Sequence, residues 1–317
     1  MTVSIINGDC RDVLRTLPDE SVHCIVTSPP YFGLRDYGVD GQLGLELTPA
    51  DFVAAMVEVF REVRRVLRDD GTLWLNLGDS YANDTYGQGG PSKKQSSNRG
   101  TVHGRTESER YRGIPEGLKK KDLIGIPWRV ALALQEDGWY LRQDIIWHKP
   151  NPMPESVTDR CTKAHEYLFL LSKGPRYYYD TDAVAEKATG EAPGNKKATK
   201  GGRAYDEGAT EHRTAANLHN IGARETRNKR SVWEVATQPF KEAHFATFPP
   251  ELIEPCIKAG CPVGGTVLDP FGGAGTTGLV ADRLQRNAIL IELNPEYAAM
   301  ADRRIYNDAP LLAGSAA

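Results

Sequence analysis

The chain has 317 residues, of which 40% are hydrophobic and 26% are charged, a composition typical of an ordinary globular protein. This length allows one large α/β domain with insertions, or two smaller domains. No apolar run approaches the ~18 residues that span a bilayer, and charged residues near the N-terminus argue against a signal peptide. We therefore expect no membrane contact and a cytoplasmic location.

Charge and cysteine content set two further limits. The net charge of −3 argues against a uniformly basic nucleic-acid binder, although one basic face is enough to hold phosphates. The five cysteines are scattered and odd in number, and no pair has a second pair to complete a zinc site. We expect reduced thiols and no bound metal.

Strands and helices alternate in the first 77 residues. Short apolar runs predict strands, and apolar residues at helical spacing predict helices. The strands are expected at 3–6, 22–26 and 72–77, and the helices at 11–17 and 49–67. Asp9 can cap the first helix, and Gly71 is predicted to end the second.

The second strand is followed by Ser28-Pro29-Pro30-Tyr31. Two successive prolines end the strand and stiffen the loop, which holds one hydroxyl and one aromatic ring in a fixed relation. In open α/β sheets, ligands bind at the carboxyl edge where this loop lies. Tyr31 could stack on a planar substrate while the Ser28 hydroxyl and the Pro29 carbonyl accept hydrogen bonds from its amino group. A plain turn with two prolines is the alternative.

Two polar segments interrupt this pattern. Residues 78–122 and 181–231 contain few large apolar residues, and such long segments are usually functional or disordered. We interpret the first as a basic loop insertion and the second as a candidate target-recognition insertion, with a solvated loop as the alternative. The residues expected to contact nucleic acid are Arg35, Lys93, Lys94, Arg99, Arg105, Lys149, Arg224, Arg227, Lys229 and Arg230.

The remaining segments return to the α/β pattern. Helices are predicted at 127–134, 250–259, 276–284 and 295–304, and strands at 140–147, 167–171, 266–268 and 288–291. This alternation implies a mostly parallel, doubly wound sheet with right-handed crossovers. Residues 306–317 are expected to form a flexible tail.

A glycine-rich loop, Asp269-Pro270-Phe271-Gly272-Gly273-Ala274-Gly275, separates a predicted strand from a predicted helix. Its glycines allow a ligand to approach the backbone closely, as in nucleoside-cofactor sites. No lysine follows to hold a triphosphate, and the spacing differs from Gly-x-Gly-x-x-Gly. The next strand ends at Glu292, where a carboxylate can bind ribose hydroxyls. A cofactor with a ribose but no pyrophosphate fits best, which favours S-adenosylmethionine.

Together the two loops resemble the motifs of the amino-group DNA methyltransferases. Ser28-Pro29-Pro30-Tyr31 is similar to the family's catalytic motif, and residues 269–277 are similar to its cofactor motif. The catalytic motif comes first here, which is the permuted order of the family's β group. The resemblance covers residues 1–77, 123–180 and 240–305, and implies one catalytic domain with a Rossmann-like, S-adenosylmethionine-dependent fold.

The resemblance also assigns roles to matched residues. Ser28, Pro29, Pro30 and Tyr31 would hold the target base. His244, Phe245, Thr247, Phe248 and Pro249 resemble the segment that packs over the methionine moiety of the cofactor. Asp9 would contact adenine and Glu292 the ribose. The residues expected at the cofactor are Asp9, Cys10, Phe248, Asp269, Phe271, Gly273, Gly275, Thr276, Thr277, Glu292 and Asn294.

The implied reaction is methylation of an exocyclic amino group on a base flipped out of double-stranded DNA, which would bring the protein to the nucleoid. Ser28 and Pro29 would accept the amino N–H bonds and direct the nitrogen lone pair at the methyl donor. In this family, serine at the first motif position is typical of cytosine N4 methylation, and aspartate of adenine N6 methylation. We expect cytosine N4, with adenine N6 as the alternative.

Other functions stay open at this point. A glutamine methyltransferase acting on protein uses a related loop, but with Asn first and after the cofactor motif. RNA methylation, a nicotinamide-dependent dehydrogenase and a catalytically silent DNA-binding module are further alternatives. The sequence does not decide the recognition site, which insertion reads the bases, whether a homodimer forms, or whether a cognate restriction endonuclease exists.

Overall fold

The computed structural model describes residues 1–34, 38–82, 114, 117–188, 225–238 and 247–308. Its internal contacts divide the chain into two compact units, residues 1–180 with 231–317, and residues 181–230. The described part of the second unit contains the short helix η2 (Asp182–Val184) and an antiparallel pair of strands, β6 (Glu186–Lys187) and β7 (Thr226–Arg227). In the described residues, no helix is long and apolar enough to cross a membrane.

The larger unit is built on an eight-stranded sheet in the order β1-β10-β9-β2-β3-β5-β4-β8. Its strands are β1 (Val3–Asn7), β2 (Val22–Thr27), β3 (Leu67–Leu77), β4 (Tyr140–His148), β5 (His165–Ser172), β8 (Val232–Glu234), β9 (Thr266–Asp269) and β10 (Asn287–Glu292). All paired strands run parallel except β5, which is antiparallel to both β3 and β4. The predicted mostly parallel sheet is therefore confirmed.

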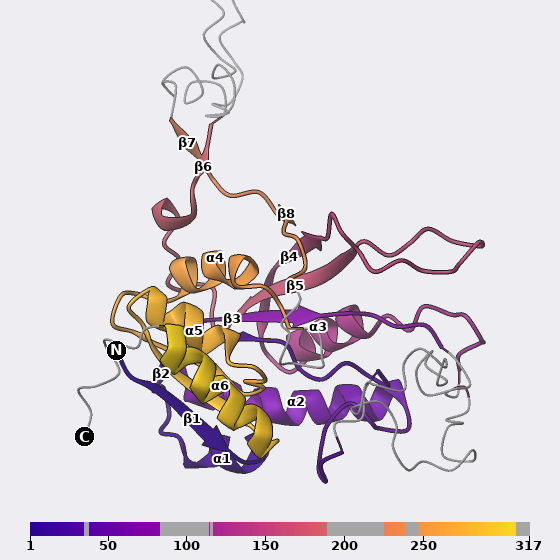
Figure 1. Ribbon diagram of the computed structural model, residues 1–317, viewed down its shortest axis with the longest axis horizontal. Coiled ribbons are helices and arrows are strands. Elements are labelled where there is room, and N and C mark those ends of the chain that lie inside the picture. The colour runs from indigo at the N-terminus through magenta and orange to yellow at the C-terminus, as the bar shows by residue number, and fades with distance from the viewer. Residues whose placement is uncertain (35–37, 83–113, 115–116, 189–224, 239–246, 309–317) are drawn as a thin grey trace, which may run out of the picture. The chain divides into compact units, whose positions relative to one another are not determined.

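Helices cover both faces of this sheet (Figure 1). One face carries α1 (Cys10–Thr16), α2 (Pro49–Val66) and α3 (Ile126–Glu136), and the other carries α4 (Pro250–Gly260), α5 (Thr276–Arg283) and α6 (Pro295–Asp308). On α2, apolar residues recur at helical spacing and bury Phe52, Met56 and Phe60 against the sheet. Burial of these faces stabilises the doubly wound arrangement expected from the sequence.

The last helix is longer than predicted. α6 continues to Asp308, whose carboxylate pairs with Arg283 of α5 at 2.5 Å. The first residues of the predicted tail, 306–308, are therefore helical, because a contact distant in sequence holds them on the fold. Residues 309–317 lie outside the described residues.

Gly71 does not end α2, contrary to the prediction. The helix ends at Val66, and Leu67 has extended backbone angles, so the chain passes directly into β3 without a left-handed residue. Gly71 lies inside β3, where a Cβ atom would come within 2.4 Å of Leu67 Cδ1 and 2.9 Å of the His23 carbonyl oxygen. Close packing therefore explains this glycine, and β3 is longer than the predicted 72–77 strand.

The direction of β5 determines which residues reach the functional edge of the sheet. The connection from β4 to β5 spans residues 149–164 and contains no helix, so the two strands pair as antiparallel neighbours. As a result, the amino end of β5 lies at the same edge as the carboxyl ends of β2, β3, β9 and β10. Glu166, near the start of β5, is thereby brought close to the loops after those strands.

The packing of α4 on the sheet depends on Gly260. An added Cβ atom would lie 2.4 Å from Thr72 Oγ1 and 2.7 Å from Trp74 Nε1. Alanine normally stabilises a helix by up to about 1 kcal/mol relative to glycine, but overpacking of a core costs about 1–3 kcal/mol. We predict that Gly260→Ala lowers the free energy of unfolding in urea.

The matched control is Gly174→Ala, because the nearest atom to its added Cβ, the Arg176 carbonyl oxygen, is 4.0 Å away. This variant should unfold within about 0.5 kcal/mol of the wild type. Equal stability of the Gly260 and Gly174 variants would contradict the packing of α4 described above.

Candidate active site

A cavity of about 920 Å³ opens at the edge of the sheet where these strand ends meet. Its volume lies within the usual range for small-molecule sites. Both predicted loops contribute to its wall. The predicted residues that line it are Asp9, Cys10, Ser28, Pro29, Pro30, Tyr31, Lys149, Thr247, Phe248, Asp269, Phe271, Gly273, Thr276, Glu292 and Asn294. His244 and Phe245 lie outside the described residues.

Two of the predicted cofactor residues, Gly275 and Thr277, shape the loop without lining the cavity. Gly275 precedes α5 with a left-handed φ of +77°, and a Cβ there would lie 2.8 Å from Ala301 Cβ. Thr277 is fully buried, and its hydroxyl lies 2.6 Å from Asp269 Oδ2 and 3.3 Å from the Val26 carbonyl oxygen. Both residues therefore fix the position of the glycine-rich loop from the side that faces away from the cavity.

Asp269 joins the two loops. Its Oδ1 accepts hydrogen bonds from the Thr27 hydroxyl at 2.6 Å and from the Phe271 N–H at 3.0 Å, while Oδ2 accepts one from Thr277. Thr27 immediately precedes Ser28, and Phe271 lies in the glycine-rich loop. Because one carboxylate binds both segments, the Ser-Pro-Pro-Tyr loop and the glycine-rich loop are held in a fixed relation. Burial raises the pKa of Asp269 to about 6 despite these donors.

Glu292 occupies the wall of the cavity beside the glycine-rich loop. Its two oxygens accept backbone N–H bonds from Gly273 and Asn294, each at 2.8 Å. Burial raises its pKa, and these N–H bonds act in the opposite direction. Each carboxylate oxygen keeps a further acceptor position, so Glu292 could bind two hydroxyl groups of a ligand.

Asp9 caps α1, as one reading of the sequence suggested, and also faces the cavity. Its Oδ1 accepts a hydrogen bond from the Arg11 N–H at 2.8 Å, and the Arg11 guanidinium lies against both carboxylate oxygens. The hydrogen bonds from Arg11 lower the pKa of Asp9. Its neighbour Cys10 is buried, which raises the pKa of the thiol to about 12. All five cysteines are free thiols, as predicted.

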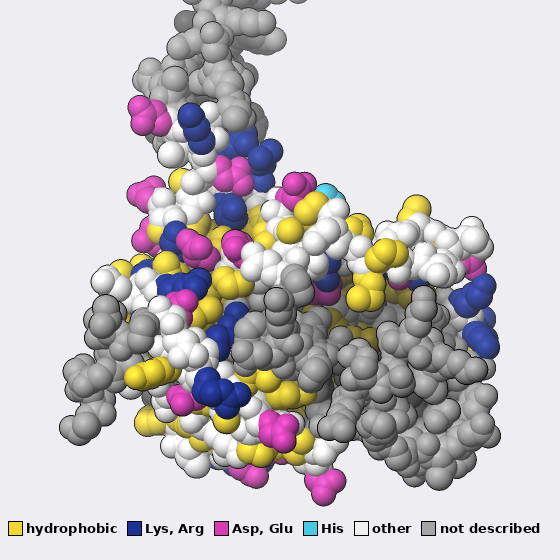
Figure 2. Space-filling model, in the orientation of Figure 1, with side chains coloured by type: hydrophobic (Ala, Val, Ile, Leu, Met, Phe, Trp, Pro, Cys, Tyr) yellow, Lys and Arg dark blue, Asp and Glu magenta, His cyan; other side chains and the backbone are white. Residues whose placement is uncertain are grey.

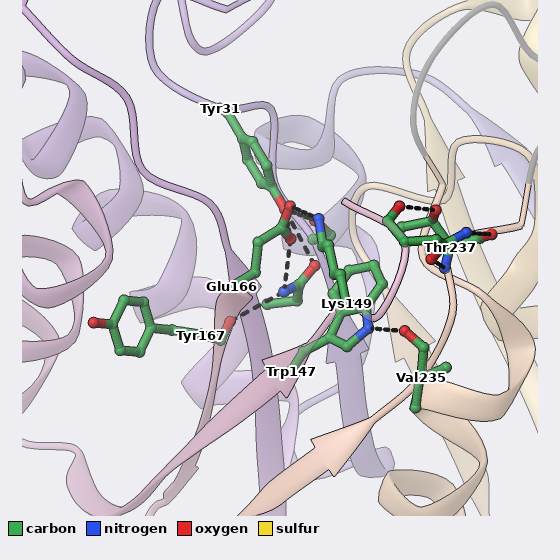
Figure 3. A network of polar contacts seen from close by, with 10 residues as sticks. Tyr31, Trp147, Lys149, Glu166, Tyr167, Val235 and Thr237 are labelled. Atoms are coloured by element: carbon green, nitrogen blue, oxygen red, sulfur yellow. Dashed lines mark hydrogen bonds and ion pairs between the residues drawn. The ribbon is translucent and has the colours of Figure 1, made fainter. Parts of the chain in front are cut away.

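The Ser-Pro-Pro-Tyr loop meets a polar network at the other side of the cavity (Figure 3). The Tyr31 hydroxyl donates to Glu166 Oε2 at 2.7 Å, and Ser28 Oγ lies 3.4 Å from the Tyr31 hydroxyl. Lys149 Nζ is 2.5 Å from Glu166 Oε1, and Asn76 Nδ2 is 3.3 Å from Glu166 Oε2. Tyr31 can occupy this position because Gly78 has no side chain, since a Cβ there would lie 2.4 Å from the ring.

The end of β4 and the segment after it are tied to the segment after β8. Trp147 Nε1 donates to the Val235 carbonyl at 2.8 Å, and the side-chain amide of Asn151 exchanges hydrogen bonds with the backbone of Thr237 (Figure 3). Lys149 Nζ also lies 4.2 Å from the centroid of the Trp147 ring. These contacts stiffen the wall that carries Lys149, Asn151 and Thr237.

Few of the predicted DNA-contacting residues lie in the described part of the chain. Lys149 lies in the cavity, paired with Glu166. In the second unit, Arg227 and Arg230 both pair with Glu186, so its basic side chains lie beside acidic ones (Figure 2). Lys229 is also described in that unit. Those outside the described residues are Arg35, Lys93, Lys94, Arg99, Arg105 and Arg224.

Residues 22–303 match the family model of the DNA methylases that modify N6 or N4 amino groups. The chain belongs to this DNA methylase family. The predicted family is confirmed, and S-adenosyl-L-methionine is the family's methyl donor, as expected. Among the relatives of this methylase, the type II methyltransferase M.Cfr9I of Citrobacter freundii is 49% identical over 305 residues, covering 96% of this chain and 88% of that protein. M.SmaI of Serratia marcescens is 48% identical over 301 residues, covering 95% and 90%.

Solved structures show the same fold. The PvuII DNA methyltransferase, whose description reads cytosine-N4-specific, aligns with a TM-score of 0.63 at 19% identity, covering 98% of this chain and 92% of that chain. TTHA0409 of Thermus thermophilus, in complex with S-adenosyl-L-methionine, aligns with a TM-score of 0.60 at 24% identity, covering 98% of this chain and 96% of that chain. The expected Rossmann-like methyltransferase fold is confirmed.

Sequence reasoning missed the polar residues that surround Tyr31. Asn76 lies in a predicted buried strand and Glu166 immediately before another, while Trp147 and Thr237 lie in or beside strands at one end of the sheet. The sequence did contain a signal for the direction of β5, because residues 149–164 include several prolines and show no helical pattern. A connection of that kind favours an antiparallel pair, which would have placed Glu166 at the cavity.

The raised pKa of Asp269 gives a pH dependence that can be measured. Its folded pKa of about 6 exceeds the ordinary value of 3.8, so the folded chain binds this proton more tightly than the unfolded chain does. The contribution to stability therefore falls as the pH rises through this window. We predict that the wild type loses up to about 1.4 kcal/mol per pH unit relative to Asp269→Asn between about pH 4 and about pH 6.

Urea unfolding of both proteins across this pH range makes the measurement. Above about pH 7 the difference between them should be constant, because Asp269 is then ionised in both states. Parallel pH profiles over the whole range would contradict the assigned burial of this carboxylate.

Proposed function

We propose that this DNA methylase transfers a methyl group from S-adenosyl-L-methionine to the N4 amino group of cytosine in double-stranded DNA. The observation that carries the proposal is the position of Ser28 at the head of a Ser-Pro-Pro-Tyr loop on the cavity wall, tied through Asp269 to the glycine-rich loop. The description of the PvuII enzyme as cytosine-N4-specific supports this choice of base.

The residues beside the glycine-rich loop fit the cofactor. Glu292 offers carboxylate oxygens to the ribose hydroxyls, and the backbone of Gly273 leaves the ligand room to approach. Phe271 and Phe248 provide apolar wall for the rest of the molecule. When bound here, the cofactor supplies an electrophilic methyl group on a sulfonium.

The opposite wall fits the amino group of a base. Ser28 Oγ and the Pro29 carbonyl oxygen are hydrogen-bond acceptors on a loop that two prolines stiffen. Accepting both N–H bonds favours a pyramidal nitrogen, whose lone pair is then directed away from the ring and across the cavity. Catalysis on this account comes from positioning, and none of the buried cysteines is required as a nucleophile.

The wider setting follows from the relatives. Both M.Cfr9I and M.SmaI are named type II methyltransferases, which supports a role in restriction and modification and hence a cognate endonuclease. Action on DNA would bring this protein to the nucleoid in the cytoplasm.

The test of the proposal is methyl transfer to duplex DNA of varied sequence, followed by mass analysis of the released nucleosides. N4-methylcytosine is the expected product. N6-methyladenine would keep the enzyme class and refute the assignment of the base, while no modified nucleoside would refute the substrate.

Replacing Ser28 by alanine removes one acceptor for the amino group and leaves the cofactor wall intact. We predict that Ser28→Ala lowers the single-turnover rate of methyl transfer by about 100-fold, with unchanged affinity for S-adenosyl-L-methionine in calorimetry. Ser21→Ala is the matched control, since the Ser21 hydroxyl bonds to the Pro18 carbonyl away from the cavity. Equal rates for the two variants would refute the role of Ser28.

Glu292→Gln tests the cofactor wall separately. The amide lacks one acceptor and brings an NH₂ group against a backbone N–H of Gly273 or Asn294. We predict an affinity for S-adenosyl-L-methionine about 10- to 100-fold lower by calorimetry, with unchanged DNA affinity. The control is Glu254→Gln, at a surface carboxylate paired with Lys258. Full cofactor affinity in the Glu292 variant would show that the ribose binds elsewhere.

A further inference from the structure

Glu166 is the centre of the polar network beside the Ser-Pro-Pro-Tyr loop (Figure 3). Its Oε1 accepts a hydrogen bond from Lys149 Nζ at 2.5 Å, and its Oε2 accepts from the Tyr31 hydroxyl at 2.7 Å and from Asn76 Nδ2 at 3.3 Å. All three partners donate, as an ionised carboxylate requires. The side chain is 16% exposed and lies on the cavity wall, next to the loop that we propose holds the target base.

A chain of hydroxyl groups leads from the base site to this carboxylate. Ser28 Oγ donates to the Tyr31 hydroxyl at 3.4 Å, and the Tyr31 hydroxyl donates to Glu166. The two hydrogen bonds run in the same direction, from Ser28 to Tyr31 and from Tyr31 to the Glu166 carboxylate. The Ser28–Tyr31 contact is the longer of the two, and hydrogen bonds that take part in catalysis often tighten when substrate binds.

The proposed reaction creates a need for such a chain. Methylation of an amino nitrogen gives that nitrogen a positive charge and one proton too many. Asn76 is also next to the Tyr31 hydroxyl, at 3.2 Å, but a neutral amide cannot take up a proton. The proton acceptor must therefore be sought among the carboxylates of the cavity.

Four carboxylates line the cavity in the described part of the chain, and they are Asp9, Glu166, Asp269 and Glu292. Asp9 is held by Arg11, and Glu292 accepts backbone N–H bonds at the cofactor wall. Asp269 is buried behind the loops with its own donors. Glu166 is the carboxylate that hydrogen bonds connect to Ser28.

We propose that Glu166 is the final proton acceptor in methyl transfer, through Tyr31 and Ser28, an inference that rests on the proposed function. As the nitrogen–carbon bond forms and the carbon–sulfur bond breaks, its electron pair stays on sulfur. The amino proton passes to Ser28 Oγ, the Ser28 proton to the Tyr31 oxygen, and the Tyr31 proton to Glu166 Oε2. Both hydroxyl groups end unchanged, the nitrogen is neutral, and Glu166 is a carboxylic acid that solvent resets.

Proton transfer to Glu166 is favourable because the methylated amino nitrogen, while it carries a positive charge, is a strong acid. A ring amine whose nitrogen lone pair has been used for the new bond loses conjugation with the ring, so its cation is a strong acid. A carboxylate can therefore take up the proton that this cation releases. Lys149 has the separate role of keeping the carboxylate in place, close to the Tyr31 hydroxyl.

The experiment compares single-turnover rates and binding constants for two variants and their combination. Glu166→Gln keeps an acceptor for the Tyr31 hydroxyl but cannot take up a proton, and Tyr31→Phe keeps the ring but breaks the chain. Each should lower the rate of methyl transfer by about 100-fold, with unchanged Kd for DNA and for S-adenosyl-L-methionine. The double variant should be no slower than the slower single variant, because both changes interrupt one relay.

Two controls separate proton transfer from structural support. Lys149→Gln removes the same ion pair and keeps the proton acceptor, so at saturating DNA its rate should fall much less than that of Glu166→Gln. Glu234→Gln, at an exposed carboxylate paired with His148, should leave the rate unchanged. A fall in Lys149→Gln equal to that in Glu166→Gln would overturn the proposal, as would independent, multiplying losses in the double variant.

Failure of this inference can be told apart from failure of the proposed function. If the wild type forms N4-methylcytosine and Glu166→Gln does so at the same rate, the relay alone is refuted. If the wild type forms no N4-methylcytosine, the proposed function is refuted, whatever the variants show.

Discussion

The site depends on one buried carboxylate, that of Asp269. It binds Thr27 at the end of β2, Phe271 in the glycine-rich loop and Thr277 at the start of α5. Thr27 leads directly into Ser28, so the group that would position the base is fixed relative to the loop that would hold the cofactor. Methyl transfer needs two reactants in one geometry, and a shared internal anchor provides it before either ligand binds. Burial disfavours the charge on Asp269. The contribution of this residue to the free energy of unfolding therefore falls as the pH rises through its pKa.

The second organising feature is the reversal of the chain at β5. In a fully parallel sheet the amino end of a strand lies at the edge away from the ligand site, but β5 runs against its neighbours and presents Glu166 at the cavity. This arrangement gives the Ser-Pro-Pro-Tyr loop a charged partner on the far side from the cofactor. The same edge would therefore combine the proposed cofactor site at β9 and β10 with the proposed proton acceptor on β5.

The sequence was sufficient for the fold class and for the two loops, because both depend on local signals. Prolines after an apolar strand and glycines between a strand and a helix can be read without knowledge of tertiary structure. The structural reason for the glycine at position 71 could not be predicted in this way. A glycine is needed there because the Leu67 side chain and the His23 carbonyl lie close to the position that a Cβ atom would take. Glu166 was missed for a similar reason, because its importance follows from strand direction and pairing rather than from neighbouring residues.

The residues predicted at the cofactor also differ in how far the sequence could place them. Glu292 and Phe271 line the cavity as expected, whereas Gly275 and Thr277 belong to the same motif and support the loop from behind. A motif thus predicts which segment forms a site, but burial decides which of its side chains can face a ligand. The predicted DNA contacts in residues 78–122 lie outside the described part of the chain, and their roles stay predictions.

A crystal structure with S-adenosyl-L-homocysteine would test most directly whether the cavity is a preformed methyl-transfer site. We predict that the ribose lies against Glu292 and that Asp269 keeps its hydrogen bonds to Thr27, Phe271 and Thr277. Ser28 should then face the ligand sulfur across the cavity with the loop unmoved. A ligand bound elsewhere, or a rearranged loop with the Thr27–Asp269 hydrogen bond broken, would contradict it.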